Sequence, residues 1–289
     1  MVEEEIMNKL LIFQKNEITE YMIYKKIANS IKDEQNKKIL EEIAEEELKH
    51  YNILKNYTQT DVKPNKLKVT FYVLLSKILG LTFSLKLMER GEERAQTSYK
   101  EVFDVIPEAR KIEEEEEKHE AELLSMIEEE RLNYTGSIVL GLNDALVELT
   151  GALAGLTFAL QNGLLIASSG LITGIAASLS MAASEYLSQR AEGNKNALKS
   201  ATYTGISYII TVVLLILPYL IIPKKYFLCL ILTLAIAVII ILGFNFYISV
   251  AKDLPFKKRF LEMASISFGV AGLTFFIGFL VRITLGIEI

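Results

Sequence analysis

Both histidines of the chain occur in the same local pattern, three residues after a glutamate. Glu47 precedes His50, and Glu116 precedes His119. Residues three apart share one face of an α-helix, so each pair would aim a carboxylate and an imidazole in the same direction. Carboxylates combined with few imidazoles suit iron or manganese and leave room for oxygen or peroxide chemistry. The spacing therefore predicts metal binding.

Two pairs of glutamates extend this pattern into a repeat. Glu17 and Glu20 lie 30 residues before the first Glu-x-x-His pair, and Glu89 and Glu92 lie 27 residues before the second. Four helices that supply carboxylates, two of them with Glu-x-x-His, form the ligand set of ferritin-like di-iron and di-manganese bundles. The alternative is a charged, solvated helix face, since a single Glu-x-x-Glu carries no information in so glutamate-rich a segment.

The first half of the chain is expected to be helical, because its apolar residues recur at helical spacing without strand-like alternation. We predict four helices, at about residues 4–30, 35–57, 67–104 and 108–131, with breaks near Asp33, in TQTDVKPN and at Pro107. The expected fold of residues 1–132 is thus an all-α, ferritin-like four-helix bundle that positions the glutamates and histidines.

Residues 67–88 are apolar over a length that would allow a membrane span. Lys77 and Lys86 would then lie in or near the bilayer, and the two Glu-x-x-His pairs would lie on opposite sides of it. We therefore expect this segment to be a buried or membrane-facing helix of the soluble domain.

The 289-residue chain divides into two halves of unlike composition. Residues 1–136 hold 29 acidic and 21 basic residues, a net charge of −8, whereas residues 137–289 hold 7 and 10, a net charge of +3. Cys229 is the single cysteine, so no intrachain disulfide is expected. The acidic start, MVEEEIMNKL, argues against a cleaved secretory signal, and no long basic run suggests a nucleic-acid partner.

The second half is too apolar for a soluble domain and predicts five membrane spans. They lie at about residues 138–160, 171–187, 203–222, 226–250 and 263–285, each near the length that crosses a bilayer. Seven Lys and Arg residues fall in SQRAEGNKNALK and AKDLPFKKRF, against Lys224 and Lys225 on the other side. Because positive loops stay in the cytoplasm, we expect an integral membrane protein with a cytoplasmic N-terminal domain and an external C-terminus.

The predicted spans carry acidic residues. Asp144 and Glu148 are four residues apart in the first span, and Met181 and Glu185 are four apart in the second. Intramembrane carboxylates are costly and usually mark an ion pathway, so these four residues are the expected transport pathway. Asp144 and Glu185 lie near the cytoplasmic ends, where snorkelling to the surface is the alternative; Glu148 lies deeper.

Gly151 and Gly155 form a Gly-x-x-x-Gly pattern in the first span. Such patterns let helices approach closely, which fits a homodimer contact. Packing of spans within one subunit explains the pattern equally simply.

The first half resembles the rubrerythrin family over about residues 8–131. Glu17 is followed seven residues later by Tyr24 and eleven residues later by Ala28, as in that family. The resemblance implies a di-iron cofactor, with manganese as the alternative metal. Its implied ligands are Glu17, Glu47, His50, Glu89, Glu92, Glu116 and His119, with Glu20 as an extra candidate. The rubredoxin Cys-x-x-Cys module is missing, which leaves the electron supply of a peroxidase cycle unexplained.

The second half, residues 137–289, resembles the vacuolar iron transporter family. The segments that carry the likeness are Asn143-Asp144-Ala145-Leu146-Val147 and Ser180-Met181-Ala182-Ala183-Ser184-Glu185-Tyr186. The resemblance implies a five-span homodimer that moves Fe(II) or Mn(II) out of the cytosol, with proton exchange in some members. Asp144, Met181 and Glu185 would form the transport site. Ala145 and Ser184 replace glycines of the family, and its glutamate-rich cytosolic insert is missing.

The whole chain resembles the membrane-bound ferritin-like proteins, in which a rubrerythrin-type domain precedes a transporter-type membrane domain. The expected function is therefore metal export, with the bundle supplying the cytosolic metal site. Two alternatives stay open. In one, the protein is a membrane-tethered di-iron peroxidase or ferroxidase; in the other, the bundle senses iron or peroxide and gates transport without turnover.

Overall fold

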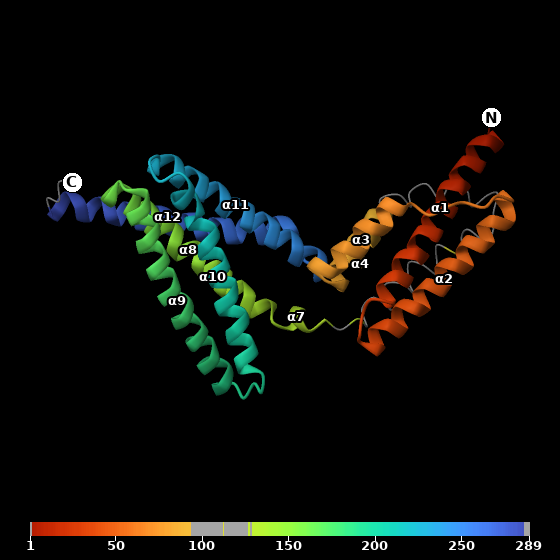
Figure 1. Ribbon diagram of the computed structural model, residues 1–289, viewed down its shortest axis with the longest axis horizontal. Coiled ribbons are helices and arrows are strands. Elements are labelled where there is room, and N and C mark those ends of the chain that lie inside the picture. The colour runs from red at the N-terminus through yellow and green to blue at the C-terminus, as the bar shows by residue number, and fades with distance from the viewer. Residues whose placement is uncertain (1, 94–111, 113–126, 128, 286–289) are drawn as a thin grey trace. The chain divides into compact units, whose positions relative to one another are not determined.

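The computed structural model describes residues 2–93, 112, 127 and 129–285, and in this part of the chain every regular element is a helix (Figure 1). The chain forms two compact units, Met1–Glu129 and Glu130–Ile289. Residues 94–111 and 113–126, which hold most of the fourth predicted helix with Glu116 and His119, lie outside the described residues.

The N-terminal unit is built on two long helices that pack against each other, α1 (Val2–Ala28) and α2 (Glu34–Thr58). Asp33 starts α2 by accepting a hydrogen bond of 2.7 Å from the backbone N–H of Asn36, which satisfies one otherwise unpaired donor of the first turn. Fully buried apolar side chains such as Ile23, Leu40 and Leu85 form the core of the unit.

The third predicted helix, over residues 67–104, is wrong as a continuous element. The chain forms α3 (Lys66–Leu79) and α4 (Leu81–Glu93), which pack against each other (Figure 1). Gly80 lies between them with φ of 105°, a conformation that a residue with a side chain rarely adopts. The Ser84 hydroxyl donates a hydrogen bond of 2.8 Å to the Tyr72 carbonyl and ties α4 back to α3.

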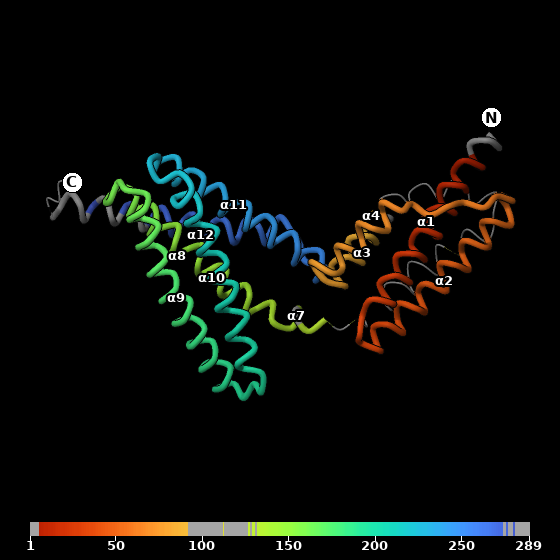
Figure 2. The backbone as a smooth tube through the Cα atoms, in the orientation of Figure 1, coloured from red at the N-terminus to blue at the C-terminus, as the bar shows by residue number. Residues whose placement is uncertain are grey.

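The second unit begins with the short helix α7 (Glu130–Asn133) and continues with five long helices (Figure 2). They are α8 (Thr135–Leu160), α9 (Gly163–Ala191), α10 (Ala197–Ile221), α11 (Tyr226–Ala251) and α12 (Phe256–Leu285). α8 contacts each of the other four, so it is the central helix of the unit. α8 and α10 approach so closely that a Cβ on Gly141 would lie 2.1 Å from the Thr204 carbonyl oxygen.

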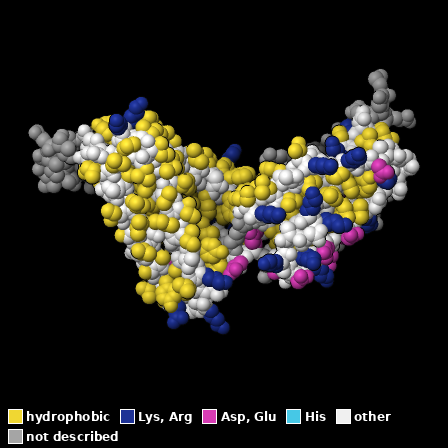
Figure 3. Space-filling model, viewed as in Figure 1, with side chains coloured by type: hydrophobic (Ala, Val, Ile, Leu, Met, Phe, Trp, Pro, Cys, Tyr) yellow, Lys and Arg dark blue, Asp and Glu magenta, His cyan; other side chains and the backbone are white. Residues whose placement is uncertain are grey.

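Four helices of the described part of the chain are long and apolar enough to cross a membrane, namely α8, α9, α10 and α11. The prediction of five spans is therefore corrected to four. The fifth predicted span falls in α12, whose start carries Lys257, Lys258, Arg259 and Glu262, and several of whose later side chains lie outside the described residues. The visible face of this unit is mostly hydrophobic in Figure 3, which agrees with a membrane-embedded unit.

Candidate metal sites

Three predicted metal ligands meet in the N-terminal unit, between α1 and α2. Glu17, Glu47 and His50 each offer one ligand atom, and these atoms all lie within 4.8 Å of one another. Glu17 Oε2 is 3.6 Å from His50 Nδ1. All three side chains are at most 3% exposed, so the group lies inside the protein rather than on a solvated face.

The packing of α1 against α2 explains why these polar side chains are buried. Leu10, Phe13, Tyr24 and Ala28 are buried at helical spacing on the face of α1 that also carries Glu17. The apolar stripe of one helix thus carries a carboxylate into the interface with its neighbour. Burying ionised carboxylates is costly unless opposite charges or a metal ion compensate.

The donor set fits a carboxylate-rich transition-metal site. Two carboxylates and one imidazole could hold a single ion, and this ligand mixture is one that suits Fe(II) or Mn(II). A second metal position, as in a di-iron centre, depends on Glu92, Glu116 and His119; the side chain of Glu92 and both of the other residues lie outside the described part of the chain.

The two remaining predicted ligands of this unit lie outside the group of three. Glu20 is 5% exposed, and its Oε1 is 3.5 Å from Nζ of Lys68 on α3. That ammonium group would compete with a metal ion for the carboxylate, and no local pattern in the sequence signals this ion pair. Glu89 lies on α4 and is half-buried. Of eight predicted ligands, the described structure brings three together.

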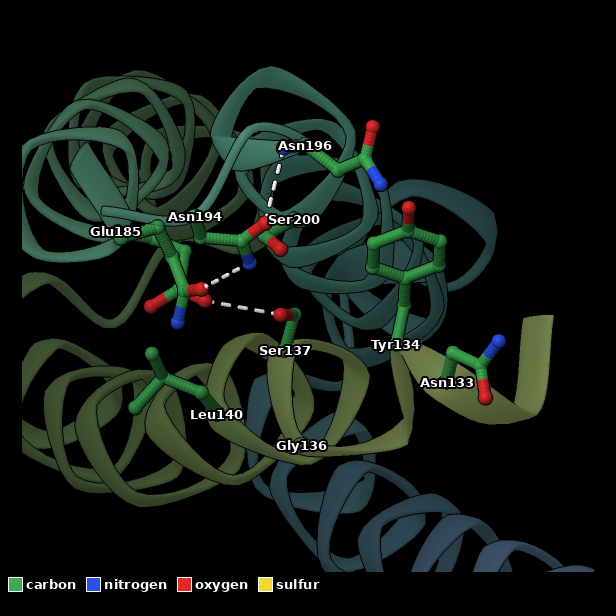
Figure 4. A pocket seen from close by; sticks show the side chains of 10 residues that line it. Asn133, Tyr134, Gly136, Ser137, Leu140, Glu185, Asn194, Asn196 and Ser200 are labelled. Carbon is green, nitrogen blue, oxygen red and sulfur yellow. Dashed lines mark hydrogen bonds between the residues drawn. The ribbon is translucent and has the colours of Figure 1, made fainter. Parts of the chain in front are cut away.

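In the membrane unit, Glu185 lies at the wall of a polar pocket. Glu185 is 8% exposed, and its Oε1 accepts a hydrogen bond of 2.8 Å from the Ser137 hydroxyl of α8 (Figure 4). The pocket has a volume of about 570 Å³ and is lined mainly by amide and hydroxyl side chains. Its lining residues are Asn133, Tyr134, Gly136, Ser137, Leu140, Glu185, Gln189, Asn194, Asn196 and Ser200.

The short turn between α9 and α10 supplies part of this pocket. Asn194 Nδ2 donates a hydrogen bond of 2.6 Å to Gln189 Oε1, and the Asn196 N–H donates one of 2.8 Å to Asn194 Oδ1. These bonds hold amide side chains that line the pocket (Figure 4). The sequence indicates the basic charge of this turn and the lack of a glutamate-rich insert, but it does not predict the pocket.

Glu148 has a partner that the sequence did not reveal. The hydroxyl of Tyr208 on α10 donates a hydrogen bond of 2.7 Å to Glu148 Oε2. Tyr208 is almost fully buried, whereas Glu148 is exposed on the surface of the single subunit. The sequence signal that could have indicated this contact is a tyrosine inside an apolar span, because a buried hydroxyl needs a hydrogen-bond partner.

Asp144 lies between these two contacts along α8 and is half-buried. It is seven residues and Glu148 is eleven residues beyond Ser137, which at 1.5 Å per residue is about 10 Å and about 16 Å along the helix axis. The bond from Ser137 fixes Glu185 near the start of α8, so three carboxylates lie in series along this helix. None of the three belongs to a group of three ligand atoms within 4.8 Å in the described residues.

Met181 does not join the carboxylates in a cluster of ligand atoms. It is half-buried and packs against the apolar core of the unit. The predicted transport residues therefore form a series of separate positions rather than one closed metal site.

Residues 135–195 match the VIT family. The matched segment contains α8 and α9, with Asp144, Met181 and Glu185, and this VIT family domain is consistent with a metal transporter. The family resemblance of the second half is thus confirmed for this segment. The match does not reach the N-terminal unit, whose ferritin-like character stays a prediction. No curated protein and no solved structure matches the chain.

Proposed function

We propose that the protein exports Fe(II) or Mn(II) from the cytosol through its membrane unit, in exchange for protons. The observation that carries this proposal is a series of three carboxylates, Glu185 of α9 beside the start of α8, then Asp144 and Glu148 of α8. Glu185 and Glu148 each accept a hydrogen bond from a neighbouring helix. A membrane anchor has no need of three carboxylates within its apolar helices. An ionised acid at the centre of a membrane span costs about 2.5–3.5 kcal/mol, and Glu148 is the deepest of the three.

The spacing of the carboxylates suits transport better than storage. A pathway must bind an ion strongly enough to replace its water and weakly enough to release it, which several separate positions achieve. Ser137 and Tyr208 each donate a hydrogen bond to one oxygen of a glutamate. Such bonds would hold each carboxylate in place and leave its other oxygen for an ion.

Proton exchange follows from the same residues. A carboxylate must be deprotonated to hold a divalent cation, so metal binding releases protons and metal release allows their return. A proton gradient across the membrane would then drive the carboxylates through alternate metal-bound and protonated states.

The direction of export rests on the charges of the turns. Arg190, Lys195 and Lys199 lie at or near the α9–α10 turn, and the α11–α12 region adds Lys252, Lys257, Lys258 and Arg259. The α10–α11 turn has only Lys224 and Lys225. Positive turns face the cytoplasm, which puts the α9–α10 turn and the N-terminal unit there. Asn194 and Asn196 of that turn line the Glu185 pocket, so the pocket is the cytosolic entrance.

The working state is proposed to be a homodimer. In the single subunit, Glu148 is exposed, and a Cβ added to Gly155 would meet no atom within 4 Å. The two positions are seven residues apart and share one face of α8. A second copy against this face would shield Glu148 from lipid tails and complete the pathway between two α8 helices.

The N-terminal unit is proposed to capture or sense the metal. The buried Glu17–Glu47–His50 group is suited to hold iron or manganese on the cytosolic side, and the short α9–α10 turn carries no comparable cluster of acids. The same group favours a second candidate function, a membrane-tethered ferroxidase or peroxidase. In that case a bound di-iron cofactor would supply the redox chemistry and the helices would serve mainly as an anchor.

The test is metal flux in proteoliposomes with the N-terminal unit facing outward. Fe(II), Mn(II) and Zn(II) are offered outside, with and without a pH gradient that is acidic inside, and lumenal metal is followed with a trapped fluorescent chelator. We expect Fe(II) and Mn(II) uptake that the gradient accelerates. Peroxide-dependent Fe(II) oxidation without uptake would favour the tethered enzyme.

A further inference from the structure

α3 has a row of large apolar side chains on its outer surface. Leu67, Phe71, Leu74 and Ile78 are 83%, 54%, 55% and 63% exposed. Their spacings of four, three and four residues align them on one face of the helix, and we call them the α3 stripe. The opposite face of α3 packs into the core of the unit, where Val69 is 2% exposed. α3 is therefore apolar on two sides, and the second side faces outward.

The charges of α3 differ from those of the unit around it. Residues 1–136 have a net charge of −8, yet α3 contains Lys66, Lys68 and Lys77 and no acidic residue. On a helical wheel, Lys66 and Lys77 flank the stripe on one side and Lys68 on the other. An apolar stripe bordered by lysines is the pattern of helices that lie at a membrane surface.

A small pocket beside the stripe has the same chemistry. It has a volume of about 260 Å³ and is lined by Lys26 of α1 together with Val69, Thr70, Val73, Leu74 and Lys77 of α3. A pocket lined by two lysines and three apolar side chains suits a group that is negatively charged at one end and hydrocarbon at the other. An anionic lipid has that construction.

We propose that α3 is an interfacial helix that lies in the cytoplasmic leaflet of the membrane that holds the chain's own spans. The α3 stripe enters the acyl-chain region, while Lys26, Lys66 and Lys77 bind the phosphate groups of anionic phospholipids. With 14 residues, α3 is about 21 Å long, too short to cross the hydrocarbon core and suited to lie in its surface. Lysine stems extend along apolar surface and keep their charge in the headgroup layer.

The bilayer fits this surface better than a second copy of the chain does. A two-fold contact through the α3 stripe would bring two lysine-bordered faces together, and like charges oppose such an interface. The chain also passes directly from Glu129 of the first unit to Glu130 of the second, and the first candidate span starts at Thr135. This short connection tethers the N-terminal unit to the start of the first candidate span.

The test uses the full chain in a Cys229→Ser background, which removes the single native cysteine. Phe71→Cys and Leu74→Cys carry an environment-sensitive fluorophore on the stripe, and Glu41→Cys carries it on an exposed position of α2 as the control. Each variant is reconstituted into phosphatidylcholine vesicles with and without phosphatidylglycerol. Lipids brominated in their acyl chains quench fluorophores in the bilayer, and iodide quenches those in water.

We expect brominated lipid to quench most of the fluorescence of the labels on the stripe. Iodide should quench the label at the Glu41→Cys control position. Quenching of the stripe labels by iodide to the extent seen at Glu41 would overturn the proposal. So would shielding from both quenchers with self-quenching that rises with the protein-to-lipid ratio, because that result assigns the stripe to a second copy.

The lysines have a separate readout. Lys26→Gln with Lys77→Gln should weaken the increase in bromine quenching that phosphatidylglycerol produces. Lys32→Gln with Lys38→Gln should not, because these exposed lysines belong neither to α3 nor to the lining of the pocket. Equal quenching with and without phosphatidylglycerol in the parent protein would contradict the anionic-lipid part of the proposal.

Discussion

The hydroxyl of Ser137 on α8 donates a hydrogen bond of 2.8 Å to Oε1 of Glu185 on α9. This bond joins residues 48 positions apart and fixes a buried carboxylate at the wall of the polar pocket. It also defines where the series of carboxylates along α8 begins. The proposed transport depends on this relationship, because it makes Glu185 the first negative charge that an ion in the pocket meets.

Ser137→Ala should weaken metal binding at Glu185 without removing the carboxylate. Loss of a hydrogen bond that orients a metal ligand typically lowers affinity about 10–100-fold, and we expect the Fe(II) concentration for half-maximal flux to rise within that range. Ser168→Ala is the matched control, since that exposed α9 hydroxyl donates its hydrogen bond to Leu165 of its own helix. An unchanged flux curve for Ser137→Ala would show that the bond is only structural.

Tyr208→Phe should slow transport, because it removes the hydroxyl that orients Glu148 and keeps the ring in the core. We expect flux to fall about tenfold or more. The control is Tyr219→Phe, which removes another buried span hydroxyl, one that is bonded to Thr157 at 2.7 Å rather than to a carboxylate. Each change should cost only about 0.5–1.5 kcal/mol of stability. If the two changes reduced flux equally, Tyr208 would have no specific role in the proposed pathway.

His50→Ala should lower the metal content of the purified full-length protein, because it removes the one imidazole of the buried group. Glu41→Ala, at an exposed position of α2, should leave metal content unchanged. Elemental analysis after growth in iron-replete medium measures this difference directly. Slow flux should persist in His50→Ala at saturating Fe(II), since the proposed pathway lies in the other unit. Complete loss of flux would make the N-terminal group an obligatory step.

Gly155→Leu should shift the protein from dimer to monomer in detergent. Gly243→Leu on α11 is the control, because an added Cβ meets no atom within 4 Å at either position in the single chain. Mass measurement of the protein–detergent complex separates the outcomes. A stable monomer in the parent protein would contradict the homodimer. A dimer that persists in Gly155→Leu would show that the dimer interface is not on this face of α8.

Local spacing predicted the features that depend on one helix. The three-residue interval between Glu47 and His50 indicated a shared face, and both lie in one buried group. The all-helical fold is confirmed for the described residues, and the transporter-family resemblance for residues 135–195. Each of these follows from helical periodicity or a short motif, which the sequence contains directly.

Contacts between helices could not be read in the same way. The bonds from Ser137 to Glu185 and from Tyr208 to Glu148 depend on which helices pack together and on their relative position along the helix axes. No local sequence pattern encodes the pairing or this relative position. The break at Gly80 was missed because a glycine inside a long helical pattern is tolerated as often as it ends a helix. α9 also begins at Gly163, earlier than the predicted span, because Asn162 caps it through the N–H groups of Leu164 and Leu165.

The most direct test of the transport proposal is Fe(II) flux in proteoliposomes carrying Asp144→Asn, Glu185→Gln or both. These changes keep side-chain size and remove the negative charge that would compensate a dehydrated divalent ion. We predict that each abolishes flux, while expression and the metal content of the N-terminal unit stay at the parent level. Normal iron export by the double variant would contradict the proposal, because the membrane carboxylates would then be structural and the tethered enzyme would become the leading function.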